Sequence, residues 1–296
     1  MVDQFTPEEV RKLKALIGSK TKPRTTHVIQ VLDESSSMTT GKDVTVSSYN
    51  EMQDIAKKSV VGTEDSVTFT LVKFSDYASI SSVRVPAGNA VALNNENYRP
   101  HGMTALFDAI GLAIKTVRNY PQDDETAFLL QIFTDGDENS STQYTAAALK
   151  SLIDELNTTG RWTVTVAGPR GNIDLFTRGL GIAKGNITTF DPSSYQSRVS
   201  NAGMMLNSTA NYFAARSVGT TAVYDSYSSI QPDTDVTYNP NNSQVIIGAT
   251  GDVSQNAIAD GSAGDLDANV KPTDAKNSAA AWPFPTGTKF SVDHTK

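Results

Sequence analysis

Short apolar runs alternate with amphipathic segments between residues 25 and 216, and this alternation limits the chain to few folds. The apolar runs are rich in β-branched and aromatic residues, which is typical of buried strands. Regular alternation of strand and helix indicates an α/β fold, with a Rossmann-like doubly wound, mostly parallel sheet and helices on both faces. The strands are predicted at residues 27–32, 66–74, 127–133, 162–167 and 186–190.

Between and after these strands, apolar residues recur at helical spacing. Residues 78–85 form a further apolar run, and it follows the strand at 66–74 so closely that we expect an antiparallel edge strand. The helices are predicted at residues 44–60, 105–120, 141–157, 172–181 and 193–216.

Two segments lie outside this repeating region. Residues 1–24 contain the helix start Thr6-Pro7-Glu8-Glu9, and we expect a helix that packs on the domain or docks a partner. Residues 217–296 hold nine aspartates, no glutamate and four lysines, and they show no helical period. We expect a low-complexity C-terminal arm that is extended or partly disordered, with Trp282 and Phe284 as a docking anchor or a clamp onto the domain at 25–216.

Composition excludes several classes of function. The net charge of -7, from 32 acidic and 25 basic residues, argues against nucleic acids and anionic membranes as partners. The absence of cysteine excludes disulfides, thiolate nucleophiles and cysteine zinc sites. The first twenty residues are charged where a signal peptide has its apolar region, and no run approaches the roughly 20 apolar residues of a membrane span. We therefore expect no signal peptide, no transmembrane segment, and a cytoplasmic or virion location.

Oxygen-bearing side chains follow two of the predicted strands. Asp33, Ser35 and Ser37 come after the first strand, and Asp135 comes after the strand at 127–133. Thr104 stands at the entrance of the helix predicted at 105–120. The carboxyl ends of parallel strands share one edge of a sheet, so we expect these five residues to lie there together. An all-oxygen set suits Mg²⁺, Mn²⁺ or Ca²⁺ better than zinc.

Three separated motifs carry a family resemblance: Asp33-Glu34-Ser35-Ser36-Ser37, Gly102-Met103-Thr104 and Thr134-Asp135-Gly136-Asp137. Together they resemble the von Willebrand factor type A (VWA) family, whose metal-ion-dependent adhesion site (MIDAS) has this chain order. The resemblance covers roughly residues 25–216. It implies that Ser35 and Ser37 bind the metal directly, that Thr104 joins when a ligand is present, and that Asp33 and Asp135 hold the metal through waters.

The resemblance implies a divalent-cation-dependent binding module that recognises an aspartate or glutamate of a partner protein. Binding is favoured over catalysis, because the three histidines are far apart in sequence and no phosphate-binding loop occurs. Two alternatives stay open. The chain could be a structural component of a large assembly, such as a phage or virus particle, whose C-terminal arm contacts neighbours, or it could be an intracellular adaptor of an ATPase or stress-response system.

Other polar residues near these motifs have open roles. Glu34 either points to solvent or adds negative potential that weakens an acidic ligand, and Asp137 and Glu138 raise the same question. We expect His101 to be a solvated loop residue rather than a ligand contact. We expect Asp108 to cap or orient structure rather than bind metal.

Overall fold

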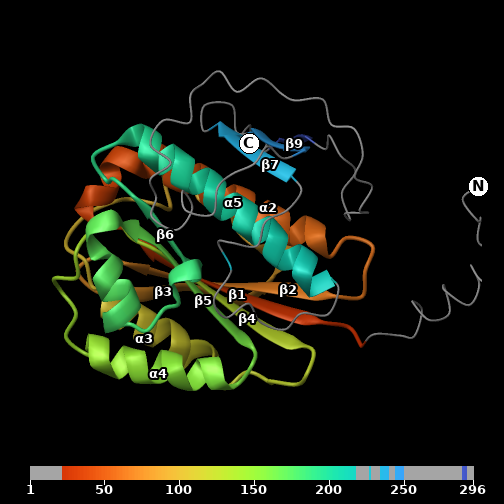
Figure 1. The fold of residues 1–296 in the computed structure, drawn as a ribbon, viewed down its shortest axis with the longest axis horizontal. Helices are drawn as coiled ribbons and strands as arrows, with labels where there is room; N and C mark the ends of the chain where they lie inside the picture. Colours follow the sequence, from red (N-terminus) through yellow and green to blue (C-terminus); the bar gives the residue numbers. More distant parts are fainter. Residues whose placement is uncertain (1–21, 218–226, 228–233, 240–243, 250–288, 292–296) are drawn as a thin grey trace, which may run out of the picture.

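The computed structural model describes residues 22–217, 227, 234–239, 244–249 and 289–291 (Figure 1). Its centre is a six-stranded sheet in the order β3-β2-β1-β4-β5-β6. All neighbouring pairs are parallel except β2 and β3, which are antiparallel, so the predicted sheet with one antiparallel edge strand is confirmed. The strands are β1 (Thr25–Asp33), β2 (Ser66–Phe74), β3 (Ala78–Pro86), β4 (Thr126–Phe133), β5 (Trp162–Pro169) and β6 (Ile187–Phe190).

Helices cover both faces of the sheet (Figure 1). One apolar core lies beneath α2 (Lys42–Ser59) and α5 (Tyr195–Ser217), and a second lies beneath α3 (Leu106–Val117) and α4 (Ala146–Thr158). Strands β1 and β4 are buried along nearly their whole length, which explains their continuous apolar character. The remaining helical turns are η1 (Ser36–Gly41), η2 (Ala87–Asn89), η3 (Arg170–Asn172), η4 (Leu175–Gly179) and η5 (Lys184–Asn186).

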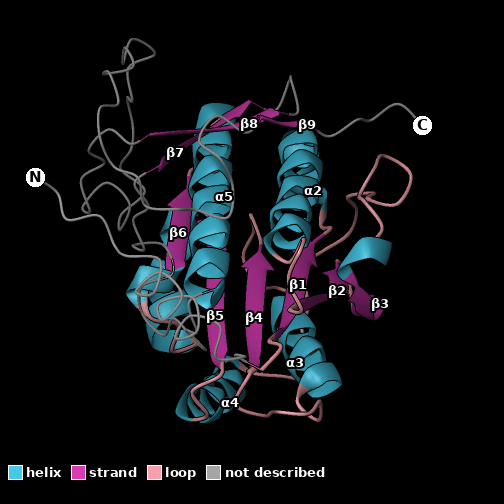
Figure 2. Cartoon of the chain, turned by 90° about the vertical axis from the view of Figure 1, so that its right-hand side faces the viewer, coloured by secondary structure: helices cyan, strands magenta, loops and turns pink. Residues whose placement is uncertain are grey.

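The chain order reverses between β1 and β4, which makes the region beyond their carboxyl ends a topological switch point, called the β1–β4 crevice below. The chain runs from β1 to β2 on one side of β1 and forms β3 at the edge of the sheet. It then returns through helix α3 to β4, which lies on the other side of β1. Figure 2 shows β1 and β4 side by side at the middle of the sheet. In open α/β sheets, ligands bind at such a switch point, beyond the carboxyl ends of the strands.

Two helix predictions were wrong in extent. The helix predicted at 141–157 begins only at Ala146, because the backbone N–H groups of residues 142–144 bind the Asp108 carboxylate instead of continuing a helix. The helix predicted at 172–181 is a short 3₁₀ turn followed by the single π-helical turn η4. In the second stretch, Gly179 and Gly181 favour an early end of the helix, and Gly181 has φ +72°.

Part of the chain beyond α5 forms a second, three-stranded antiparallel sheet. Its strands are β7 (Thr234–Asn239), β8 (Gln244–Ala249) and β9 (Lys289–Ser291). The predicted N-terminal helix and the Trp282–Phe284 cluster lie outside the described residues, and the division at residues 24 and 216 stays a prediction. In the part of the chain that the structure describes, no helix combines the length and apolarity needed to cross a bilayer.

His27 gives the fold a pH dependence. Its ring is buried against Tyr120 and Phe128, and its Nδ1 lies 2.7 Å from the Thr68 hydroxyl. Burial, assisted by Arg84, lowers the pKa of His27 from 6.5 to about 4. Between pH 6.5 and 4 the unfolded chain binds this proton and the folded chain does not, so His27 makes stability fall with falling pH, by at most about 3 kcal/mol.

We expect His27→Gln to flatten this slope. Glutamine does not titrate and can still hydrogen-bond Thr68, so urea unfolding at several pH values between 4 and 7 should show a smaller loss of free energy for the variant. An identical slope in both proteins would mean that His27 is not the titrating group.

Candidate functional site

Asp33 is the last residue of β1, and its carboxylate shapes the turn that follows. One carboxylate oxygen, Oδ1, accepts a hydrogen bond from the Ser35 backbone N–H at 2.7 Å, which turns the chain into η1. The other oxygen accepts from the Thr134 hydroxyl at 2.7 Å, and Thr134 directly follows β4. The side chain is completely buried. Asp33 thus ties the ends of the two central strands together.

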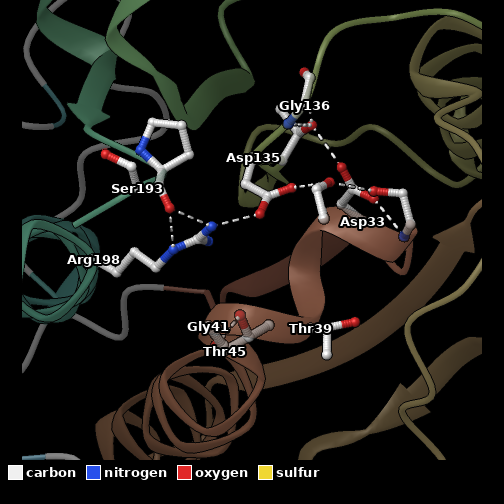
Figure 3. A network of polar contacts seen from close by, with 12 residues as sticks. Asp33, Thr39, Gly41, Thr45, Asp135, Gly136, Ser193 and Arg198 are labelled. Atoms are coloured by element: carbon white, nitrogen blue, oxygen red, sulfur yellow. Dashed lines mark hydrogen bonds and ion pairs between the residues drawn. The ribbon is translucent and has the colours of Figure 1, made fainter. Parts of the chain in front are cut away.

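A chain of hydroxyl contacts leads from Asp33 to Asp135. The Ser35 and Ser37 hydroxyls lie 3.0 Å apart, and Ser37 Oγ donates to Asp135 Oδ1 at 2.6 Å. The second oxygen of Asp135 forms a 2.7 Å ion pair with Arg198 of α5. Figure 3 shows the guanidinium of Arg198 pointing at the Asp135 carboxylate from the side opposite Asp33.

Thr104 is placed by a turn and two hydrogen bonds. Gly102 has φ +71°, and a Cβ at this position would meet the Asp76 carboxylate at 2.5 Å, so both the backbone conformation and the space require glycine. Asp76 accepts from the Met103 N–H at 2.8 Å. Asn139 accepts from the Thr104 N–H at 2.9 Å and donates its own N–H to the Thr104 carbonyl at 3.1 Å. The Thr104 residue is therefore fixed from both sides.

Gly136 shows how close the hydroxyls are. A Cβ built on Gly136 would lie 3.3 Å from Thr104 Oγ1 and 3.5 Å from Ser37 Oγ. These two hydroxyls, which are far apart in sequence, therefore border the same small space. The structure brings all five residues predicted for the site to one edge of the sheet, at the β1–β4 crevice.

The Asp33 carboxylate carries a charge that the protein compensates only in part. Burial raises the pKa of Asp33 from 3.8 to about 6, and the hydrogen bonds from Ser35 and Thr134 and the charge of Asp135 have smaller effects. No arginine or lysine of the described residues forms an ion pair with Asp33. A bound cation would supply the missing positive charge.

Glu34 does not point to solvent. Its side chain is 11% exposed and forms an ion pair with Lys73, at 3.0 Å from Nζ to Oε2. Its Oε1 also accepts from the Arg99 N–H, and its carbonyl accepts from the His101 N–H. The Glu34 charge is therefore neutralised locally, and the side chain anchors the loop that leads to Thr104.

Glu138 and Asp108 organise the loop after β4. Glu138 accepts hydrogen bonds from the backbone N–H groups of Phe107, Ser140 and Ser141. Because Phe107 lies in the first turn of α3, the negative charge of Glu138 interacts favourably with the N-terminus of this helix. Asp108 accepts three backbone N–H groups at 2.9 Å, which confirms the prediction that it orients structure.

The two remaining residues with open roles lie at the rim. Asp137 is exposed. His101 is exposed as well, and its two ring nitrogens lie near the Arg99 carbonyl and the Ser75 hydroxyl. Both positions agree with solvated loop residues.

Sequence reasoning missed two residues of the site. Thr134 stands beside Asp135 in the motif, and its contact with Asp33 could have been inferred from the pairing of β1 with β4. Arg198 has no local sequence signal. Its position at the start of the helix after β6 places it at the same edge of the sheet, which is visible only once the strand order is known.

Comparison with known proteins gives likeness in structure only. No protein-family model matches the sequence, and no curated protein matches it either. Solved structures similar to this chain include proximal thread matrix protein 1 from the mussel byssus, at 16% identity and a TM-score of 0.41 over 61% of this chain and 44% of that one. They also include a von Willebrand factor type A protein from Catenulispora acidiphila, at 16% identity and a TM-score of 0.41 over 66% and 44%.

The pilus adhesin SpaC from Lactobacillus rhamnosus GG has 13% identity and a TM-score of 0.47, over 66% of this chain and 32% of that one. The mussel protein has also been solved with a zinc-occupied MIDAS motif, at 17% identity and a TM-score of 0.34 over 49% and 36%. This chain spans less than half the length of each of these proteins. At these values the likeness is one of fold and assigns no role to any residue of this chain.

Proposed function

We propose that this chain is a VWA-type binding module that holds a divalent cation at the β1–β4 crevice and uses it to bind an acidic side chain of a partner protein. The observation that carries the proposal is the convergence of Asp33, Ser35, Ser37, Thr104 and Asp135 at this crevice, with three hydroxyls and only two carboxylates. Mg²⁺ is the expected cation, with Mn²⁺ or Ca²⁺ as substitutes.

The donor chemistry fits a hard cation. The five side chains that converge at the crevice all offer oxygen, and the described residues contain no group of three or more histidine, aspartate or glutamate side chains that could hold a metal. Cation binding at this crevice would therefore depend on the hydroxyls as well as on the two carboxylates. The buried carboxylate of Asp33, which has no ion-pair partner among the residues that the structure describes, supports this interpretation, because a buried charge without a counter-charge is costly.

Each residue has a distinct part in this proposal. The hydroxyls of Ser35, Ser37 and Thr104 would hold the cation without neutralising it, while Asp33 and Asp135 would orient hydroxyls and waters around it. A bound cation supplies an electrophilic centre that accepts a carboxylate oxygen. Because neutral hydroxyls surround the cation, it keeps charge with which to attract an anionic ligand.

Binding fits the described residues better than catalysis. One serine–histidine pair occurs near the site, with Ser75 Oγ 3.2 Å from His101 Nε2. Ser75 is buried, and the other ring nitrogen of His101 faces the Arg99 carbonyl rather than a carboxylate. This pair therefore closes a loop and lacks the oriented base of a hydrolase.

The proposal can be tested with Mn²⁺, whose bound waters enhance the relaxation of solvent protons. We expect a short peptide with one glutamate to displace a water from the Mn²⁺-loaded full chain and to lower the relaxation rate, whereas the matched glutamine peptide should have little effect. The Asp33→Asn variant should show no enhancement on addition of Mn²⁺. If Mn²⁺ produces no enhancement in the wild type, or if both peptides act alike, the proposal is wrong.

A further inference from the structure

Arg198 is a buried cation that directly adjoins the proposed cation site. Its side chain is 6% exposed, and its partner Asp135 has a completely buried side chain. The guanidinium also donates to the Pro192 carbonyl through Nε at 3.1 Å and through Nη2 at 2.9 Å. Its Cζ lies 5.3 Å from the centre of the Phe190 ring. These contacts fix both the position and the orientation of the guanidinium (Figure 3).

The ion pair divides the Asp135 carboxylate between two neighbours. Oδ2 faces Arg198, and Oδ1 accepts from the Ser37 hydroxyl. Both oxygens are thus engaged within the protein, and the negative charge of Asp135 is met by a positive one. A bound cation would feel Asp135 chiefly through the Ser37 hydroxyl that it orients.

Two further acids near the site are compensated too. Glu34 is paired with Lys73, and Glu138 receives backbone N–H groups at the start of α3. Of the three buried acids Asp33, Glu34 and Asp135, only Asp33 has no ion-pair partner within the described residues. A divalent cation together with Asp33 would therefore retain one positive charge.

We infer that Arg198 is a positioning residue that sets this charge balance: it neutralises Asp135 and thereby lets the loaded site select an anionic ligand. The inference rests on the proposed function and names the feature of this chain that provides its selectivity. Without the guanidinium, a second free carboxylate would hold the cation more tightly and leave it less attractive to an acidic ligand.

Gly41 makes room for this arrangement. It stands at the junction of η1 and α2 with φ -111°, which any residue can adopt. A Cβ at Gly41 would lie 2.8 Å from Arg198 Cδ and 2.9 Å from Nη1, which is too close. Gly41→Ala therefore shifts the guanidinium without removing its charge.

The test measures two affinities in the variants Arg198→Gln and Arg198→Lys. The first is the affinity of the protein for Mn²⁺, measured by calorimetry, and the second is the affinity of the Mn²⁺-loaded protein for the glutamate peptide. For Arg198→Gln we expect about tenfold tighter Mn²⁺ binding and about tenfold weaker peptide binding, while Arg198→Lys stays within about threefold of wild type. A merely structural role for Arg198 would weaken both affinities. Weakening of both, or no change in either, overturns the inference.

Gly41→Ala provides a second variant in case Arg198→Gln does not fold. We expect it to tighten Mn²⁺ binding and to weaken peptide binding, each by about threefold, because the displaced guanidinium neutralises Asp135 less well. A change of both affinities in the same direction, or no change in either, would overturn the inference. If the wild-type protein binds no Mn²⁺, both the proposed function and the inference are refuted. If the wild type binds Mn²⁺ and the glutamate peptide but Arg198→Gln leaves both affinities unchanged, only the inference is refuted.

Discussion

Replacing Asp33 with asparagine should stabilise the metal-free protein while removing its response to divalent cations. The Asp33 carboxylate is buried without a cationic partner among the described residues, and its pKa is raised to about 6. Above pH 6 the group is ionised in both folded and unfolded states, so the folded protein bears the full cost of the buried charge. Asparagine keeps an acceptor for the Ser35 N–H and removes this charge.

We expect a gain of about 2 kcal/mol at pH 7 in chelator, which corresponds to a melting temperature about 4–8 °C higher. The sign follows from the raised folded pKa: the unfolded chain releases the Asp33 proton near pH 4 and the folded chain only near pH 6, so the contribution of Asp33 to stability becomes less favourable as the pH rises between these values. The difference between variant and wild type should therefore grow over this range and then stay constant. Thermal melts across pH values, with and without Mg²⁺, measure it.

Asp137→Asn is the matched control for Asp33→Asn, because Asp137 is an exposed aspartate of the same rim. It should keep both the wild-type melting temperature in chelator and the increase that Mg²⁺ produces. A lower melting temperature for Asp33→Asn in chelator at pH 7 would show that the carboxylate stabilises the empty site, contrary to our expectation.

Asp108→Asn should produce the largest loss of stability at the rim of the site. The carboxylate accepts the N–H groups of Thr142, Gln143 and Tyr144, each at 2.9 Å, and asparagine would turn its amide N–H₂ toward at least one of these donors. Loss of charge-assisted hydrogen bonds in a buried position costs about 2–4 kcal/mol. The same loop contains Asn139, which holds Thr104, so cation affinity should fall as well.

Urea unfolding measures the stability loss, and hydrogen exchange of the amides at 142–144 locates it. The control is Asp154→Asn on α4, where an exposed pair with Lys150 contributes less than about 1 kcal/mol. If Asp108→Asn lowered the free energy of unfolding no more than Asp154→Asn does, the three hydrogen bonds from the backbone to Asp108 would not be what stabilises this loop.

Much of the fold was predictable because strands and helices alternate with clear apolar patterns. The run at 127–133 is apolar on both faces because β4 is buried on both, and it appears in the structure as Thr126–Phe133. The five residues predicted for the site converge for a related reason. Parallel strands end at one edge, so the acids at the carboxyl ends of β1 and β4 are brought together by topology.

What could not be predicted depends on contacts between distant segments. Glu34 is paired with Lys73 on β2, and Arg198 reaches Asp135 from α5, but neither pair has a recognisable spacing in the sequence. The late start of α4 has the same origin, because its N-terminal loop is held by Asp108 from α3. Periodicity describes which residues are buried, whereas these partners follow from three-dimensional packing.

Isothermal titration calorimetry of the full chain with Mg²⁺, Mn²⁺ and Ca²⁺ tests the central claim most directly. We expect at least one of these cations to bind at a single site in the wild type, to lose measurable binding in Asp33→Asn, and to bind normally in Asp137→Asn. The absence of binding for all three cations in the wild type, or unchanged binding in Asp33→Asn, would contradict a cation site at the β1–β4 crevice.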